Sequence, residues 1–128
     1  MTQATTPTKA ARLQSCNEVL TEFRGILAKY DAALELRATH IDGVNDAYLI
    51  QTSQGIYAKS ENGKVWGTGA LHATRYALAD AKRLAPLTQN GAGAVGSVVN
   101  VWDALTHDRA DIALQIQTIE AMAASLAE

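Results

Sequence analysis

The residues with the most recognisable chemical spacing lie in a glycine-rich stretch at 91–96 (GAGAVG). They match the G-x-G-x-x-G pattern that holds the phosphates of a dinucleotide. That pattern needs a strand before it, a helix after it and an acidic side chain about 20 residues further on. Here a proline-containing helical pattern comes first, and Glu120 falls deep in a predicted helix. Residues 89–96 are therefore predicted to form a plain Gly/Ala loop, and nucleotide or small-ligand binding is the least favoured function.

Few side chains could ligate a metal or act as a nucleophile. His40, His72 and His107 lie 32 and 35 residues apart, and none has the short His or Cys spacing of a zinc site. The single cysteine, Cys16, falls on an apolar stripe and is predicted to be a small buried hydrophobe. The sequence therefore predicts no catalytic residue, no metal and no cofactor, and it predicts the histidines at surface or capping positions.

Acidic side chains recur late in the chain and are the candidate partner-binding residues: Asp103, Asp108, Asp111 and Glu120. In one interpretation they line the solvated face of a helix. In the other they form an acidic surface that engages a basic groove on a partner, because complementary charge steers specific association. Both interpretations stay open on the sequence alone.

Aromatic residues fall on three strand-like runs, as Tyr48, Tyr57 and Trp66. They could pack against one another across a sheet, or stack on single-stranded bases as sheet aromatics do in some RNA-binding folds. The basic and glycine-containing aromatic motif of those folds is missing, so core packing is favoured.

The bulk composition sets the frame for these residues. The 128 residues carry 11 basic and 13 acidic side chains, and the basic ones are scattered, which argues against direct nucleic-acid binding. One cysteine fits a reducing compartment, and no apolar run is long enough to span a membrane. The sequence predicts one α+β domain over residues 1–128, with a flexible arm at 1–6 and a cytoplasmic location.

Apolar residues at alternating spacings of three and four predict one long helix over residues 7–38, with a heptad stripe running from Leu13 to Leu34. A second long helix is predicted from about residue 106 to the end, and a shorter one over 75–87. Two such stripes in a small chain must both be covered, either by each other or by another molecule.

Between the helices, the runs 47–52, 56–59 and 64–67 predict an antiparallel meander. Asn62-Gly63 is a strong hairpin signal because both residues adopt positive φ readily. Residues 97–105 (SVVNVWDAL) fit both a strand and a helix, and their β-branched content favours a fourth strand. The expected fold is thus α+β, a small antiparallel sheet of three or four strands with two long amphipathic helices and one shorter helix.

The stretch 48–105 reads YLIQTSQGIYAKS, KVWG, ATRYALADAKRLA and GSVVNVWDAL. This strand-strand-helix-strand order resembles that of many small phage and prophage accessory proteins, some of which are anti-defence factors of the anti-CRISPR type. The resemblance implies a stoichiometric binder of a host protein or ribonucleoprotein complex, and it implies no site residue.

The sequence therefore favours a non-enzymatic interaction protein that occupies a surface on a larger partner, as an inhibitor of a bacterial defence complex would. The alternative is a structural or assembly protein that forms a homodimer or larger assembly through its long first helix.

Overall fold

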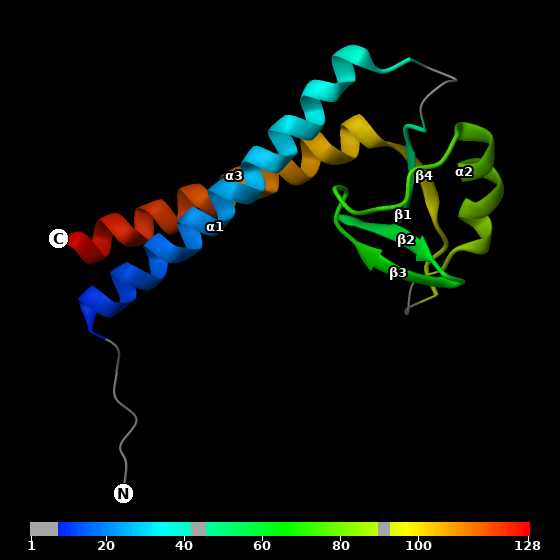
Figure 1. The fold of residues 1–128 in the computed structure, drawn as a ribbon. Coiled ribbons are helices and arrows are strands. Elements are labelled where there is room, and N and C mark those ends of the chain that lie inside the picture. The colour runs from blue at the N-terminus through cyan, green and yellow to red at the C-terminus, as the bar shows by residue number, and fades with distance from the viewer. Residues whose placement is uncertain (1–7, 42–45, 90–92) are drawn as a thin grey trace, which may run out of the picture. The chain divides into compact units, whose positions relative to one another are not determined.

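The computed structural model describes residues 8–41, 46–89 and 93–128. They form the predicted α+β fold, in which two long helices and one short helix accompany a four-stranded antiparallel sheet (Figure 1). In chain order the elements are α1 (Lys9–Glu35), a 3-10 helix (Leu36–Thr39), β1 (Tyr48–Ser53), β2 (Ile56–Glu61), β3 (Lys64–Thr68), α2 (Leu78–Leu84), a second 3-10 helix (Ala85–Leu87), β4 (Ser97–Asn100) and α3 (Val101–Ala127). The predicted N-terminal arm, residues 1–6, lies outside the described residues.

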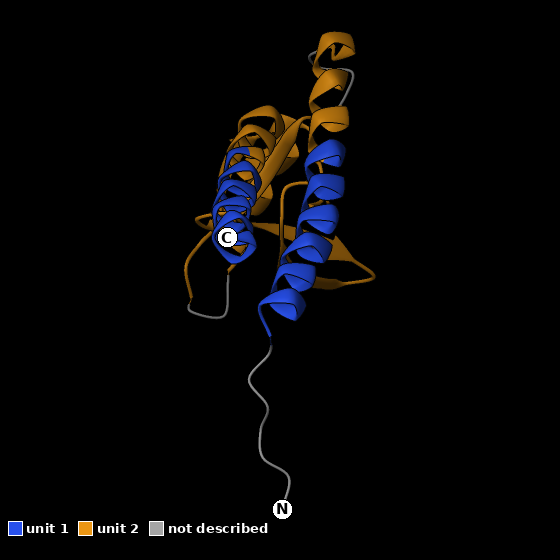
Figure 2. Cartoon of the chain, turned by 90° about the vertical axis from the view of Figure 1, so that its left-hand side faces the viewer, with its two compact units in different colours: residues 1–29, 110–128 blue, residues 30–109 orange. Residues whose placement is uncertain are grey.

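The chain divides into two compact units, and the division falls inside both long helices (Figure 2). We call residues 1–29 and 110–128 the helical unit, because its described part consists of the first turns of α1 and the last turns of α3. Residues 30–109 form the sheet unit, which also holds the end of α1 and the start of α3.

In the helical unit, α1 and α3 lie side by side and antiparallel. Lys9 Nζ at the start of α1 donates to the backbone oxygen of Glu128, and Arg24 pairs with Glu120 at 3.4 Å. The predicted stripe of α1 faces inward, since Cys16 and Leu20 are buried, and Ile116 of α3 is buried in the same unit. The helix begins slightly later than predicted, because Thr8 Oγ1 accepts from the backbone N–H of Ala11 at 3.1 Å and so caps it.

In the sheet unit the strand order is β3-β2-β1-β4, and every pairing is antiparallel. The β2–β3 turn is the predicted Asn62-Gly63 turn, with φ of 54° and 77°. On one face, Ile50 and Ala58 pack against Ala85 beside α2. On the other face, the first turns of α3 lie against sheet residues that include Tyr57. Helical segments therefore lie on both faces of the sheet, while the edge strand β3 is largely exposed.

The ambiguous segment 97–105 is a strand only over its first four residues. Ser97–Asn100 pairs with β1 as β4, and α3 begins at Val101, five residues before the predicted start. Asn100 causes the switch, because its Oδ1 accepts from the backbone N–H of Trp102 at 2.8 Å and caps the helix.

The helix predicted over 75–87 is shorter than expected. It divides into α2 and the 3-10 helix that holds Pro86, and the backbone of Tyr76 instead bridges to Tyr48 of β1. Proline lacks the N–H that a continuing α-helix needs, which explains the tighter last turn.

Candidate functional site

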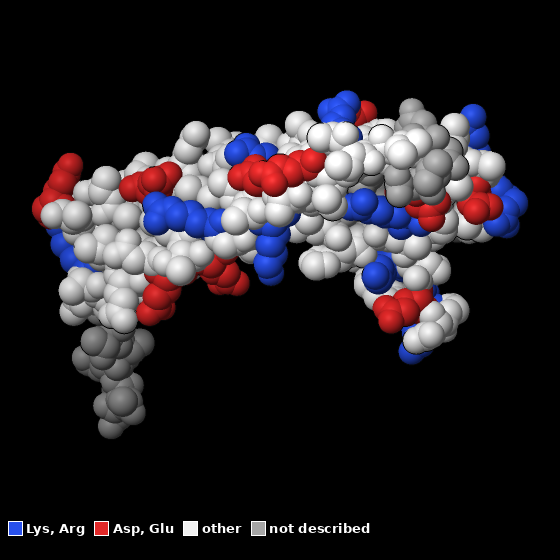
Figure 3. All heavy atoms as spheres, turned by 45° about the horizontal axis from the view of Figure 1, so that its top comes forward, with Lys and Arg blue, Asp and Glu red and all other residues white. Residues whose placement is uncertain are grey.

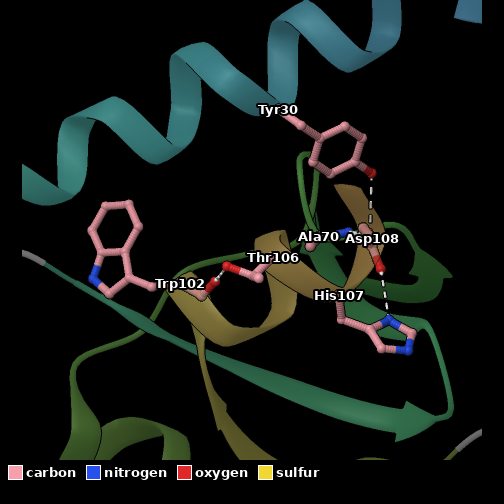
Figure 4. Close-up of polar contacts among 6 residues, drawn as sticks. All are labelled: Tyr30, Ala70, Trp102, Thr106, His107 and Asp108. Carbon is pink, nitrogen blue, oxygen red and sulfur yellow. Dashed lines mark hydrogen bonds and ion pairs between the residues drawn. The ribbon is translucent and has the colours of Figure 1, made fainter. Parts of the chain in front are cut away.

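Polar groups cluster around Asp108 of α3, a buried carboxylate in the sheet unit (Figure 4). Asp108 Oδ2 accepts from the hydroxyl of Tyr30 at 3.2 Å and from the backbone N–H of Ala70 at 2.8 Å. His107 Nδ1 lies 3.6 Å from the other carboxylate oxygen. One carboxylate thus holds α1, the loop after β3 and α3 together.

Tyr30 acts as a fixed proton donor in this cluster. Burial, and then the charge and hydrogen bond of Asp108, raise the pKa of the Tyr30 phenol well above its usual value. A phenol with a raised pKa keeps its proton at neutral pH and cannot serve as a base there. Next to this pair, Asp31 of α1 forms an ion pair with Arg109 and raises the pKa of that guanidinium. These contacts form a clamp that joins the end of α1, the loop after β3 and the start of α3.

A small pocket lies where Trp102 meets the end of α1. His40 stands edge-on to the Trp102 ring, with centroids 5.5 Å apart, and the Arg75 guanidinium lies 5.9 Å from the ring centroid. Leu36, Thr39 and Asp46 complete the lining. Sequence analysis missed this grouping because His40 and Trp102 stand far apart in the chain and share no motif.

The structure distributes the four predicted acidic residues rather than gathering them. Asp108 is buried and accepts hydrogen bonds from Tyr30 and Ala70. Asp103 and Asp111 are exposed on α3, and Glu120 is exposed but paired with Arg24. A helical periodicity of 100° per residue puts these side chains on different sides of the helix. A role for the three exposed ones in partner binding stays a prediction.

The other sequence candidates lie apart from one another. Cys16 is buried, as predicted. Among the residues the structure describes, no group of three or more His, Cys, Asp or Glu side chains could hold a metal ion. Tyr57 is buried as core packing requires, whereas Trp66 on β3 is 44% exposed.

The glycine-rich stretch has a structural explanation at its described end. Residues 90–92 of the predicted loop 89–96 lie outside the described residues. Gly96 leads into β4 rather than a helix, so a phosphate-binding turn does not form at this glycine. A Cβ at Gly96 would lie 2.4 Å from Ile50 Cγ2 and 2.9 Å from the Ala85 carbonyl oxygen. Close packing therefore explains the glycine here.

An apolar groove runs along the helical unit between α1 and α3. Phe23 of α1 and four residues of α3, Leu114, Gln115, Thr118 and Ile119, line it. Leu114 is 62% exposed, and Met122 one turn beyond Thr118 is 49% exposed. Large apolar side chains are thus presented to solvent along one side of α3.

The two helices of this unit differ sharply in charge. Residues 9–29 of α1 carry six charged side chains, whereas residues 110–127 of α3 carry two, Asp111 and Glu120. A helix that faces water on one side normally has a charged outer face, and a helix apolar on most sides is normally covered. The α3 side of the helical unit is therefore a candidate interaction surface.

Charge elsewhere is mixed. On the face drawn in Figure 3, Lys and Arg alternate with Asp and Glu, and no large region of one sign appears. None of the described helices is both long enough and apolar enough to span a membrane.

Comparison with known proteins assigns no family to this chain. No protein-family model matches this sequence, and no curated protein or solved structure is significantly similar to it.

Proposed function

We propose that this protein is a non-enzymatic interaction module that acts by binding another protein surface through its helical unit. The observation that carries the proposal is the groove lined by Phe23 and α3, flanked by the exposed side chains of Leu114 and Met122. Contiguous exposed apolar surface of this kind marks interaction sites in soluble proteins.

The energetics of the surface support docking. Covering the exposed part of Leu114 or Met122 contributes about 1–2 kcal/mol each, from the usual value for burying a large apolar side chain. Phe23 and Ile119 are half-buried beside them and supply a preformed wall. A wall that already exists costs less entropy on binding than one that must be ordered.

The resemblance to phage accessory proteins names the first larger partner to test, a CRISPR-type defence complex of a bacterial host. In this proposal the chain works as a stoichiometric inhibitor and needs no cofactor. The exposed carboxylates of Asp103 and Asp111 would add electrostatic steering towards a basic surface of that complex.

The test is phage challenge of bacteria that carry one defined CRISPR-type system and express the chain. We expect plaque formation to recover with the native sequence, and to fall with Leu114→Lys, which places a charge on the apolar surface. Gln117→Lys is the matched control, because Gln117 is exposed on the same helix but does not line the groove. Equal plaque counts with and without the chain across several such systems would refute the inhibitor role.

A further inference from the structure

We propose that the pocket beside Trp102 binds a free α-amino acid with an apolar side chain. Arg75 and the indole of Trp102 hold its carboxylate, and Asp46 holds its ammonium group. The pocket lies wholly within the sheet unit, so the inference goes beyond the proposed function and does not depend on the groove beside α3.

Four segments that are distant in sequence meet at this pocket. Its lining comes from the end of the first 3-10 helix and the residue after it, from the residues just before β1 and α2, and from the first turn of α3: Leu36, Thr39, His40, Asp46, Arg75 and Trp102. The cavity measures about 230 Å³. Pockets for drug-sized ligands measure roughly 300–1,000 Å³, so this one fits a smaller molecule, of the size of an amino acid.

The indole of Trp102 offers a hydrogen-bond donor to this pocket. Its ring projects from the first turn of α3 away from the Asp108 cluster (Figure 4). Trp102 is only 5% exposed, and none of the described residues accepts a hydrogen bond from its Nε1–H. Within the same part of the chain no sealed side-chain nitrogen or oxygen lacks a partner, so this N–H reaches open space, and the pocket is the space that Trp102 lines.

Arg75 adds a guanidinium that is held in place without an acceptor. It lies 5.9 Å from the centroid of the Trp102 ring, and no carboxylate of the described residues pairs with it. A guanidinium and an indole N–H can only donate hydrogen bonds, so a ligand that satisfies both must present acceptor atoms. A carboxylate fits best, because the planar guanidinium binds its two oxygens through two parallel hydrogen bonds.

Asp46 argues against a simple anion as the ligand. Its exposed carboxylate lines the same pocket and pairs neither with Arg75 nor with any other described residue. Like charges in one small cavity repel each other, so Asp46 disfavours a phosphate or a dicarboxylate. A molecule with a cationic group beside its carboxylate uses both Arg75 and Asp46, and an α-amino acid carries these two groups on one carbon.

The remaining lining favours an apolar side chain on this amino acid. Leu36 is 57% exposed, and with the Trp102 ring it forms an apolar wall that a ligand would cover. The hydroxyl of Thr39 already donates its hydrogen to the backbone oxygen of Leu36 at 3.0 Å, so it offers no hydrogen to a polar side chain.

The experiment is titration calorimetry of the full chain with L-leucine as the probe. Leucine should bind with one molecule per chain. Two analogues each remove one charge: 4-methylpentanoate lacks the ammonium group, and leucinamide lacks the carboxylate. Each should bind about tenfold more weakly than leucine or worse, since hydrogen bonds to charged groups are the strong ones. Inorganic phosphate, the third probe, should bind more weakly than leucine.

Variants assign the roles of the two donors. Arg75→Gln should weaken leucine binding by about 30-fold. Arg83→Gln is the matched control and should leave it unchanged, because Arg83 is exposed on α2, pairs with Asp80 and lies outside the pocket. Trp102→Phe keeps an aromatic ring and removes the N–H, so it should weaken binding by about fivefold. Circular dichroism checks that each variant keeps its fold.

Asp46→Asn supplies a readout that a folding defect would not give. It should weaken the binding of leucine by about tenfold and leave the binding of 4-methylpentanoate unchanged or tighter, because the repulsion of a carboxylate is removed with the attraction of the ammonium group.

Three results would overturn the inference. Equal affinity of the native chain for leucine and 4-methylpentanoate would show that Asp46 does not recognise an ammonium group. Tighter binding of phosphate than of leucine would make the pocket a plain anion site. Absence of heat with leucine up to its solubility limit would show that the pocket takes no such amino acid. None of these results bears on the plaque assay of Leu114→Lys, so the two proposals fail separately.

Discussion

The helical unit and the sheet unit contain different parts of the same two long helices, and these parts differ in how deeply they are buried. In the sheet unit, 14 apolar residues are buried, and the first turns of α3 contribute Val101, Trp102, Ala104 and Leu105 to that core. In the helical unit only Cys16, Leu20 and Ile116 among the described residues are buried, while Leu114 of the same α3 stands in solvent.

The difference has a geometric cause. A sheet with elements on both faces encloses side chains from all directions, whereas two helices side by side can only cover one stripe each. The remaining sides of a two-helix hairpin must be polar or must be covered. In this chain the outer side of α1 carries charged residues, whereas that of α3 mixes uncharged polar side chains with the exposed Leu114 and Met122. The sheet unit thus holds most of the buried apolar residues, although it also exposes large apolar side chains such as Leu87 and Val65. In the helical unit few residues are buried, and Leu114 and Met122 are exposed.

The largest expected effect contrasts two leucines nine residues apart on α3. Leu105→Ala should lower the free energy of unfolding by about 2–5 kcal/mol, since Leu105 is fully buried and its loss leaves a cavity. Leu114→Ala should change the free energy of unfolding by less than about 0.5 kcal/mol, because Leu114 is 62% exposed. Urea unfolding measures both. Equal losses in the free energy of unfolding would contradict the distinction between the buried start of α3 and its exposed later turns.

The next largest loss in the free energy of unfolding should come from removing Asp108, the centre of the clamp in the sheet unit. Asp108→Ala leaves the Tyr30 hydroxyl and the Ala70 N–H without an acceptor, and should cost about 2–3 kcal/mol. Asp103→Ala, on the same helix but exposed, is the matched control and should cost less than about 0.5 kcal/mol. Thermal melts of the two variants decide it. Similar melting points would show that Asp108 does not hold the elements together.

Alkaline pH should weaken the sheet unit through Tyr30. The folded-state pKa of Tyr30 lies above the unfolded value, so the folded chain keeps a proton that the unfolded chain releases. The stabilisation is complete below about pH 10 and falls above it by up to about 1.4 kcal/mol per pH unit. Urea midpoints from pH 9 to 11 should therefore fall more steeply for the native chain than for Tyr30→Phe. Parallel curves would contradict this assignment.

The smallest effect belongs to the ion pair of the helical unit. Arg24 and Glu120 are each at least half exposed, so the pair is screened by water and salt. Arg24→Gln should change the free energy of unfolding, measured by urea titration, by less than about 0.5 kcal/mol. A loss of more than about 1 kcal/mol would show that the pair contributes more than a screened surface ion pair does.

Periodicity in the sequence was enough to predict the α+β class, the inward stripe of α1 with Cys16 on it, and the Asn62-Gly63 hairpin. These features depend on neighbours within a few residues, where side-chain spacing and backbone preference act directly. The change from strand to helix at Asn100 was not predicted, because Val98 and Val99 favour a strand while the capping asparagine favours a helix start. The chain follows the first preference up to Asn100 and the second after it.

The roles of individual charged and aromatic residues depended on tertiary structure. Asp108 looked like its acidic neighbours along α3 until the fold brought it to Tyr30, 78 residues away, and to the loop at Ala70. The sequence carries the apolar stripes, and so determined that α1 and α3 must be covered. Which sides of them are covered within one chain, and which remain open at Leu114 and Met122, was decided only when distant segments met, because burial belongs to the whole set of contacts and not to any local pattern.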